Sequence, residues 1–79
     1  MTKNEMIDRF DFLTDVIRAS RGLGYFTTGE RMLLHLERSA LLSAQDGLYP
    51  NDGARATPWY CIPREMELKC QHVKKDFNL

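Results

Sequence analysis

The sequence contains few cysteines, no long apolar run and no net charge. Two cysteines among 79 residues are too few for the disulfide framework of a small secreted protein. The apolar runs are only a few residues long, whereas a membrane-spanning helix needs about 20 consecutive apolar residues. The sequence also has no secretory signal. We therefore expect a protein of the reducing cytoplasm with no membrane partner.

The absence of net charge limits how the chain could gather nucleic acid. Eleven basic and eleven acidic side chains balance, so any basic surface must be local. The composition, 43% hydrophobic and 28% charged, is that of a globular chain. We expect one domain, residues 1–79, near the size at which a single core is only marginally stable. Pairing with a second copy would stabilise such a domain.

Motifs of catalysis and of metal or cofactor binding are scarce. Cys61, Cys70 and His72 lack the paired close spacing of a zinc site and a clear fourth ligand. On a helix, Cys70 and His72 would point roughly 200° apart, which does not suit a nucleophile and its base. The glycines on either side of Leu23 lack the lysine of a phosphate-binding loop. We therefore expect no enzyme, no metal and no cofactor.

A long first helix is predicted over residues 2–21. Thr2 with Glu5 forms a capping box at its start. Seven apolar residues line the helix: Met6, Ile7, Phe10, Phe12, Leu13, Val16 and Ile17. They span an arc of roughly 220°, against the roughly 100° that an ordinary surface helix buries. Either the helix is sandwiched inside the domain, or one side, including Phe12 and Val16, forms a protein interface such as a homodimer contact.

A second helix is predicted from Thr27 to about Gln45. Gly22 and Gly24 end the first helix, because glycine adopts the left-handed conformation common at helix ends. Thr27 with Glu30 then forms another capping box. The second helix is apolar over much of its circumference, so we expect it at the centre of the core.

A loop is predicted over residues 46–58, which contain two Gly, two Pro, two Asp and an Asn. The turn signals lie at residues 49–53. So long a loop in a compact domain is either mobile or functional. Trp59 and Tyr60 follow it. They either pack beneath the loop or anchor a protein partner.

The carboxy-terminal stretch, residues 62–79, does not follow one helical face. Its apolar residues are Ile62, Met66, Leu68, Val73 and Phe77. Val73 and Phe77 define a second face after the polar stretch 69–72. This spacing predicts two short helices joined by a tight turn.

That pattern resembles the helix-turn-helix of DNA-binding domains. Residues 27–79 also follow the order of a winged-helix domain, with a helix introduced by T-T-G-E-R-M-L-L, then the loop, then the two short helices. Such domains occur in small phage or bacterial transcriptional regulators and in phage replication initiators. The hairpin wing would be absent, because the chain stops at Leu79. The expected fold is a small all-α domain of three to four helices with a carboxy-terminal helix-turn-helix.

The resemblance implies a sequence-specific regulator of transcription or replication that binds double-stranded DNA. Its recognition helix would be residues 69–78, lying in the major groove. The residues expected to contact DNA are Lys69, Gln71, His72, Lys74, Lys75, Asn78 and Arg64. The other interpretation of residues 74–76 is a solvated helix end. The alternative function is a small inhibitor or adaptor of phage type that binds a host or defence protein.

Overall fold

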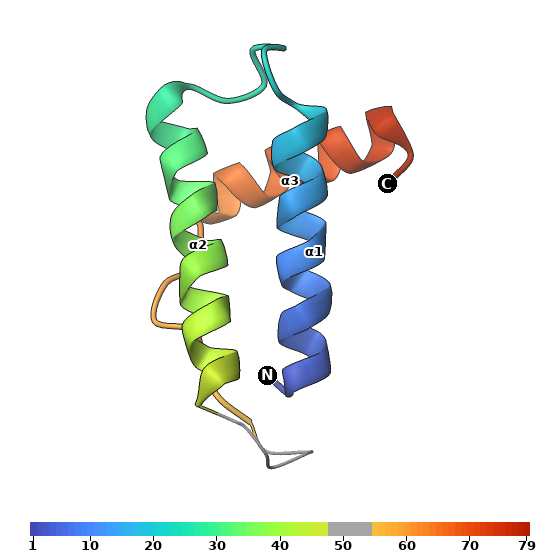
Figure 1. The fold of residues 1–79 in the computed structure, drawn as a ribbon. Helices are drawn as coiled ribbons and strands as arrows, with labels where there is room; N and C mark the ends of the chain where they lie inside the picture. The colour runs from blue at the N-terminus through green and yellow to red at the C-terminus, as the bar shows by residue number, and fades with distance from the viewer. Residues whose placement is uncertain (48–54) are drawn as a thin grey trace.

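The computed structural model describes residues 1–47 and 55–79 (Figure 1). This part of the chain contains three α-helices: α1 (Lys3–Ala19), α2 (Thr28–Asp46) and α3 (Arg64–Phe77). α1 and α2 run side by side in opposite directions, and α3 crosses this hairpin (Figure 1). No helix among the described residues is long and apolar enough to cross a membrane. The expectation of a small all-α domain is confirmed.

Both predicted capping boxes are present. At the start of α1, the Glu5 amide donates to Thr2 Oγ1 at 3.2 Å and the Thr2 amide to Glu5 Oε1 at 2.8 Å. At the start of α2, the corresponding bonds join Thr27 and Glu30 at 3.1 and 2.9 Å. These bonds satisfy backbone donors that have no partner within the helix. Local sequence therefore fixes where the first two helices begin.

The link between α1 and α2 turns through two left-handed glycines. Gly22 and Gly24 have φ values of 74° and 75°, which glycine adopts without the strain of a Cβ atom. Ser20 ends α1, and its buried hydroxyl donates to the Val16 carbonyl at 2.7 Å. Phe26 then returns to the core. Tyr25 also packs against the core, whereas Leu23 between the two glycines is 56% exposed.

The wide apolar face of α1 is used within the domain. α2 packs on one side of it and α3 on the other. Leu13 and Val16 are fully buried, and Phe12 is half-buried and packs against the core. The sandwiched arrangement therefore explains the wide arc. Val16 is fully buried, so it offers no contact surface on the folded chain.

The carboxy-terminal stretch is one continuous helix, α3, and the prediction of two short helices was wrong. Met66, Cys70, Val73 and Phe77 are spaced four, three and four residues apart, which is a single helical stripe. Cys70 stands within residues 69–72, which were expected to form a polar stretch. It is fully buried and acts as a small hydrophobe. Leu68 lies off this stripe and is 53% exposed.

The segment before α3 is tied to the amino terminus. The Met1 amino group donates to the Ala56 carbonyl, and the Ala56 amide donates to the Met1 carbonyl, both at 2.9 Å. Ile62 is buried just before Pro63, which is the N-cap of α3. The predicted turn signals at residues 49–53 lie outside the described residues.

Candidate functional site

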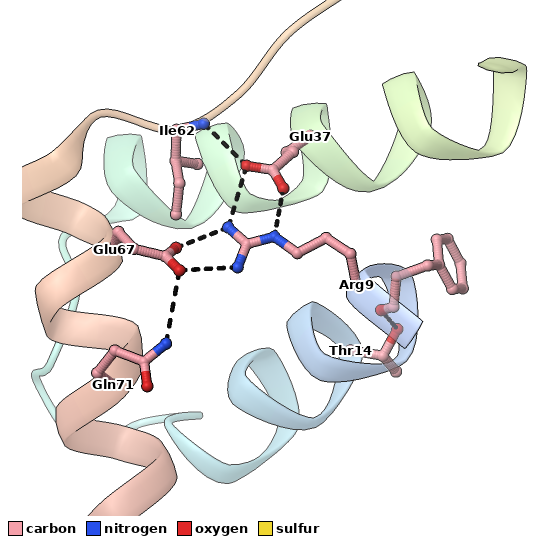
Figure 2. Close-up of polar contacts among 7 residues, drawn as sticks. Arg9, Thr14, Glu37, Ile62, Glu67 and Gln71 are labelled. Carbon is pink, nitrogen blue, oxygen red and sulfur yellow. Dashed lines mark hydrogen bonds and ion pairs between the residues drawn. The ribbon is translucent and has the colours of Figure 1, made fainter. Parts of the chain in front are cut away.

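A partly buried ion cluster joins all three helices, and Figure 2 shows its contacts. Arg9 of α1 lies between Glu37 of α2 and Glu67 of α3; we call these three residues the Arg9 cluster. Arg9 Nε donates to Glu37 Oε2 at 2.7 Å, and Nη2 donates to Glu37 Oε1 at 3.4 Å. Nη1 and Nη2 donate to the two Glu67 oxygens at 2.9 and 2.6 Å. One guanidinium thus binds two carboxylates from different helices.

The charges of the Arg9 cluster are fully hydrogen-bonded. Glu37 is only 2% exposed and also accepts the Ile62 amide at 2.9 Å. Burial would lower the pKa of Arg9, but its bonds to Glu67 and Glu37 raise that pKa overall. The hydrogen bonds from Arg9 lower the pKa of Glu67 despite its partial burial. No buried side-chain nitrogen or oxygen among the described residues lacks a partner. The cluster therefore fastens α3 to the hairpin.

The cluster was not predicted from the sequence, although a signal was present. Arg9 stands between the buried residues Met6 and Leu13, three and four positions away. Glu37 stands in the same register between Leu34 and Leu41. A charged residue on the buried face of a helix needs an opposite charge. Two such residues of opposite sign on neighbouring helices were a sign of an ion pair.

Further polar contacts fix the two edges of α3. Lys69 Nζ donates to the Glu30 carboxylate of α2 at 2.8 and 3.0 Å, and its hydrogen bond lowers the pKa of Glu30. Lys74 Nζ lies 5.9 Å from the centroid of the Phe12 ring of α1. Two of the residues expected to contact DNA thus lie along the edges of α3.

The carboxy-terminal half of α3 is also held by the link between α1 and α2. The Tyr25 hydroxyl donates to Asp76 Oδ2 at 2.5 Å, and this bond raises the pKa of Tyr25. The Tyr25 ring packs edge-on against Phe77, with centroids 6.2 Å apart. α3 is therefore held at both of its ends.

The outer face of α3 carries most of the other predicted DNA contacts. At about 100° per residue, one arc of roughly 100° contains Arg64, Leu68, Gln71, His72 and Lys75, which we call the outer face. It lies opposite the buried stripe, and all five residues are exposed. In the described structure, neither of its two cations has an ion-pair partner closer than 4.0 Å.

Gln71 and Asn78 differ from the other residues that were predicted to contact DNA. Gln71 donates to Glu67 at 3.5 Å, within its own helix (Figure 2). Asn78 is the C-cap of α3 and has a left-handed backbone, with φ 55°. Its side chain is exposed beyond the last turn. The structure thus brings Arg64, Gln71, His72 and Lys75 onto one surface and leaves Asn78 at its end.

The residues predicted to form a protein interface differ in how far they are buried. Trp59 is 62% exposed, and its ring centroid lies 6.3 Å from that of Tyr60. Tyr60 is half-buried against the core. Phe12 is half-buried, and the Cζ atom of Arg9 lies over the Phe12 ring, 5.4 Å from the ring centroid. Of this set, only Trp59 has most of its side chain exposed to solvent. This disagrees with the interpretation in which Trp59 packs beneath the loop.

A cavity of about 350 Å³ opens beside the Arg9 cluster, between Leu41, Pro58 and Ile62. Cys61 stands at this cavity and is exposed, whereas Cys70 is buried elsewhere. Burial raises the pKa of the Cys70 thiol to about 11, so it stays protonated at neutral pH. The described residues hold no cluster of three metal-binding side chains. Its charged side chains are those of the Arg9 cluster, which already bind one another, and Arg64 at the start of α3.

Searches against models of protein families, curated proteins and solved structures give no match to this chain, so its function is inferred from its own geometry.

Proposed function

We propose that the protein is a cytoplasmic regulator of transcription or replication that binds double-stranded DNA through the outer face of α3. The observation that carries the proposal is the division of the charges on this helix. The lysines at the edges contact α2 and α1. Arg64 and Lys75 lie exposed on the side away from the core, and neither forms an ion pair with another described residue.

The shape of α3 supports this proposal. Fourteen residues make a helix about 21 Å long at 1.5 Å per residue, and the major groove of B-DNA is wide enough to admit such a helix. Because the core contacts lie on one side only, the opposite side is available to a groove. The single helix α3 would then take the place of the recognition helix that was expected at residues 69–78.

The residue types on the outer face suit base and phosphate contacts. An arginine binds guanine with two hydrogen bonds, and a glutamine binds adenine in the same way. Arg64 and Gln71 supply these groups, Leu68 suits a thymine methyl group, and Lys75 suits a phosphate. His72 and Asn78 would make further polar contacts. Lys69 would contribute little, because it is already bound to Glu30.

The test is a duplex DNA titration at several salt concentrations, with two variants that each remove one exposed positive charge. Lys75→Gln changes the outer face, and Arg55→Gln is the matched control on the segment before α3. We expect wild-type affinity to fall with salt. In Lys75→Gln the slope of log K against log salt should be shallower by about 0.9, the value for one phosphate contact. The control should follow the wild type.

Two results would contradict the proposal. Absence of DNA binding even at low salt would exclude the function for this chain. Equal loss of affinity in Lys75→Gln and Arg55→Gln would mean that only net charge matters and that the outer face of α3 has no special role.

A second candidate is a protein-binding inhibitor or adaptor, favoured by the exposure of Trp59. An exposed tryptophan is a frequent anchor in protein interfaces. Affinity capture should then recover a partner with the wild type and with Lys75→Gln but not with Trp59→Ala. Recovery of the same proteins by the Trp59 variant would exclude this role.

A further inference from the structure

A second cavity, of about 220 Å³, lies between α1 and α2 near the link that joins them. Its lining is strongly basic and consists of Ile17, Arg18, Arg21, Arg31 and His35; we call it the arginine cavity. No carboxylate lines it. In a chain with no net charge, three guanidinium groups around one cavity are a marked local excess of positive charge.

The arginine cavity opens on the side of the hairpin away from the Arg9 cluster. Arg18 follows Arg9 by nine residues, which places the two side chains roughly 180° apart around α1. His35 precedes Glu37 by two residues, which places them roughly 200° apart around α2. Both helices therefore turn this cavity away from α3, and the site is separate from the outer face of α3.

The three arginines of the cavity are not neutralised within the described structure. Arg18 and Arg21 are exposed, and no ion pair joins either of them to a carboxylate. Arg31 donates to Ser20 Oγ at 3.3 Å and to the Ile17 carbonyl at 3.2 Å. Both acceptors are uncharged. Since a guanidinium has five N–H donors, Arg31 is held in place with donors to spare.

His35 adds an imidazole ring to the lining of the same cavity. Arg38 Nη1 lies 3.4 Å from His35 Nδ1. Because arginine can only donate, Nδ1 is the acceptor in this contact. Arg38 is itself held by Thr14 Oγ1 at 3.0 Å and stacks over Phe10 at 4.6 Å. The ring that lines the cavity is thus oriented by contacts outside it.

Stabilisation of the helix end does not account for the whole cluster. Cations near the carboxy terminus of α1 are favourable because of the helix dipole, and Arg31 already binds a carbonyl of its last turn. Two further arginines at the same place add mutual repulsion, and neither side chain forms an ion pair with a carboxylate in the part of the chain that the structure describes. An anion between them would remove this repulsion.

We propose that the arginine cavity binds the phosphate group of a small phosphorylated ligand. The planar guanidinium forks match phosphate oxygens in a bidentate manner. The volume is below the roughly 300 to 1,000 Å³ of pockets that enclose drug-sized ligands, so the cavity suits the phosphate while the rest of the ligand lies outside. The site does not depend on the proposed DNA binding.

The test is isothermal titration of the full chain with inorganic phosphate and with a nucleoside monophosphate at low ionic strength. Arg21→Gln removes an exposed cavity arginine whose side chain makes no hydrogen bond or ion pair with another described residue, and Arg55→Gln removes one exposed charge elsewhere. We expect saturable one-site binding of at least one of the two probes to the wild type. Affinity should fall roughly tenfold in Arg21→Gln, the loss of one charge-assisted hydrogen bond, and stay within about twofold in the control.

The outcomes separate this site from the α3 surface. No saturable binding of either probe, or equal affinity in the wild type and Arg21→Gln, would overturn the proposal. A DNA titration of Arg21→Gln completes the test. If neither small probe binds but this variant loses DNA affinity, the proposal is overturned and the cavity contacts nucleic-acid phosphates instead. Failure of DNA binding in Lys75→Gln alone bears only on the outer face of α3.

Discussion

Replacing Arg9 by methionine tests how the buried ion cluster holds the three helices together. Methionine keeps most of the length and apolar stem of the arginine and removes its charge. Glu37, which is 2% exposed, would then be a buried carboxylate whose remaining partner is the Ile62 amide. Glu67 would lose both of its bonds to Arg9 but is partly exposed to water.

The expected cost follows from the burial of Glu37. Removing one partner of a buried ion pair costs about 3 to 5 kcal/mol, because the other charge is left without compensation. At about 0.05 to 0.15 kcal/mol per residue, 79 residues give a total stability of about 4 to 12 kcal/mol. Arg9→Met should therefore remove a large share of the free energy of unfolding and lower Tm by at least about 12 °C.

The assay is urea unfolding followed by circular dichroism, on Arg9→Met, Glu37→Gln and the double variant. Because both side chains belong to one pair, the losses in the single variants should not add. The double variant should be less destabilised than the sum of the two, by roughly 1 to 3 kcal/mol. Glu67→Gln should cost less than Glu37→Gln, since Glu67 is about one-third exposed and water screens its charge.

Two results would refute this reasoning. One is a loss below about 1 kcal/mol in Arg9→Met, which is the range of a surface ion pair. The other is strict additivity of Arg9→Met and Glu37→Gln, which would mean that the two residues contribute independently.

Three further predictions concern pH, the link between α1 and α2, and the cysteines. Hydrogen bonds lower the pKa of Glu67 and Glu30 below the ordinary value of 4.5, so the stabilisation by these carboxylates is complete well above pH 4.5 and is lost as pH falls through the lowered folded values. Tm should therefore decrease as the pH is lowered below about 4.5, and this decrease should be smaller in Glu67→Gln than in the wild type. An equal decrease in both proteins would contradict the assignment of the lowered pKa to Glu67. Gly24→Ala should cost about 1 to 2 kcal/mol in urea unfolding, because a φ of 75° strains a residue with a Cβ atom even where space is open; a neutral effect would show that the link adapts. A thiol reagent at neutral pH should label Cys61 within minutes and Cys70 only on unfolding, because Cys70 is buried and its pKa is raised to about 11; equal labelling rates under native conditions would contradict the burial of Cys70.

The sequence alone determined the features that depend on neighbours along the chain. Thr2 and Thr27 cap their helices because the partner glutamate stands three residues later, within reach of a local hydrogen bond. Gly22 and Gly24 turn the chain because glycine needs no neighbour to adopt a positive φ. An all-α fold follows from such signals together with the helical spacing of the apolar residues.

Only the tertiary structure decided the features that depend on partners far along the chain. Cys70 became part of the core, and α3 one helix, because α1 and α2 supply a surface that buries Met66, Cys70 and Val73. Arg9 meets Glu37 and Glu67 across 28 and 58 residues of sequence, a separation at which no spacing rule applies.

The same packing divided the cations of the chain. Lys69 binds Glu30, whereas Lys75 lies on the outer face of α3 and Arg18 lines the arginine cavity. Burial and ion pairing depend on what lies opposite a side chain in space. The sequence therefore shows which residues are charged, and the packing of the helices determines which of these residues remain available to a ligand.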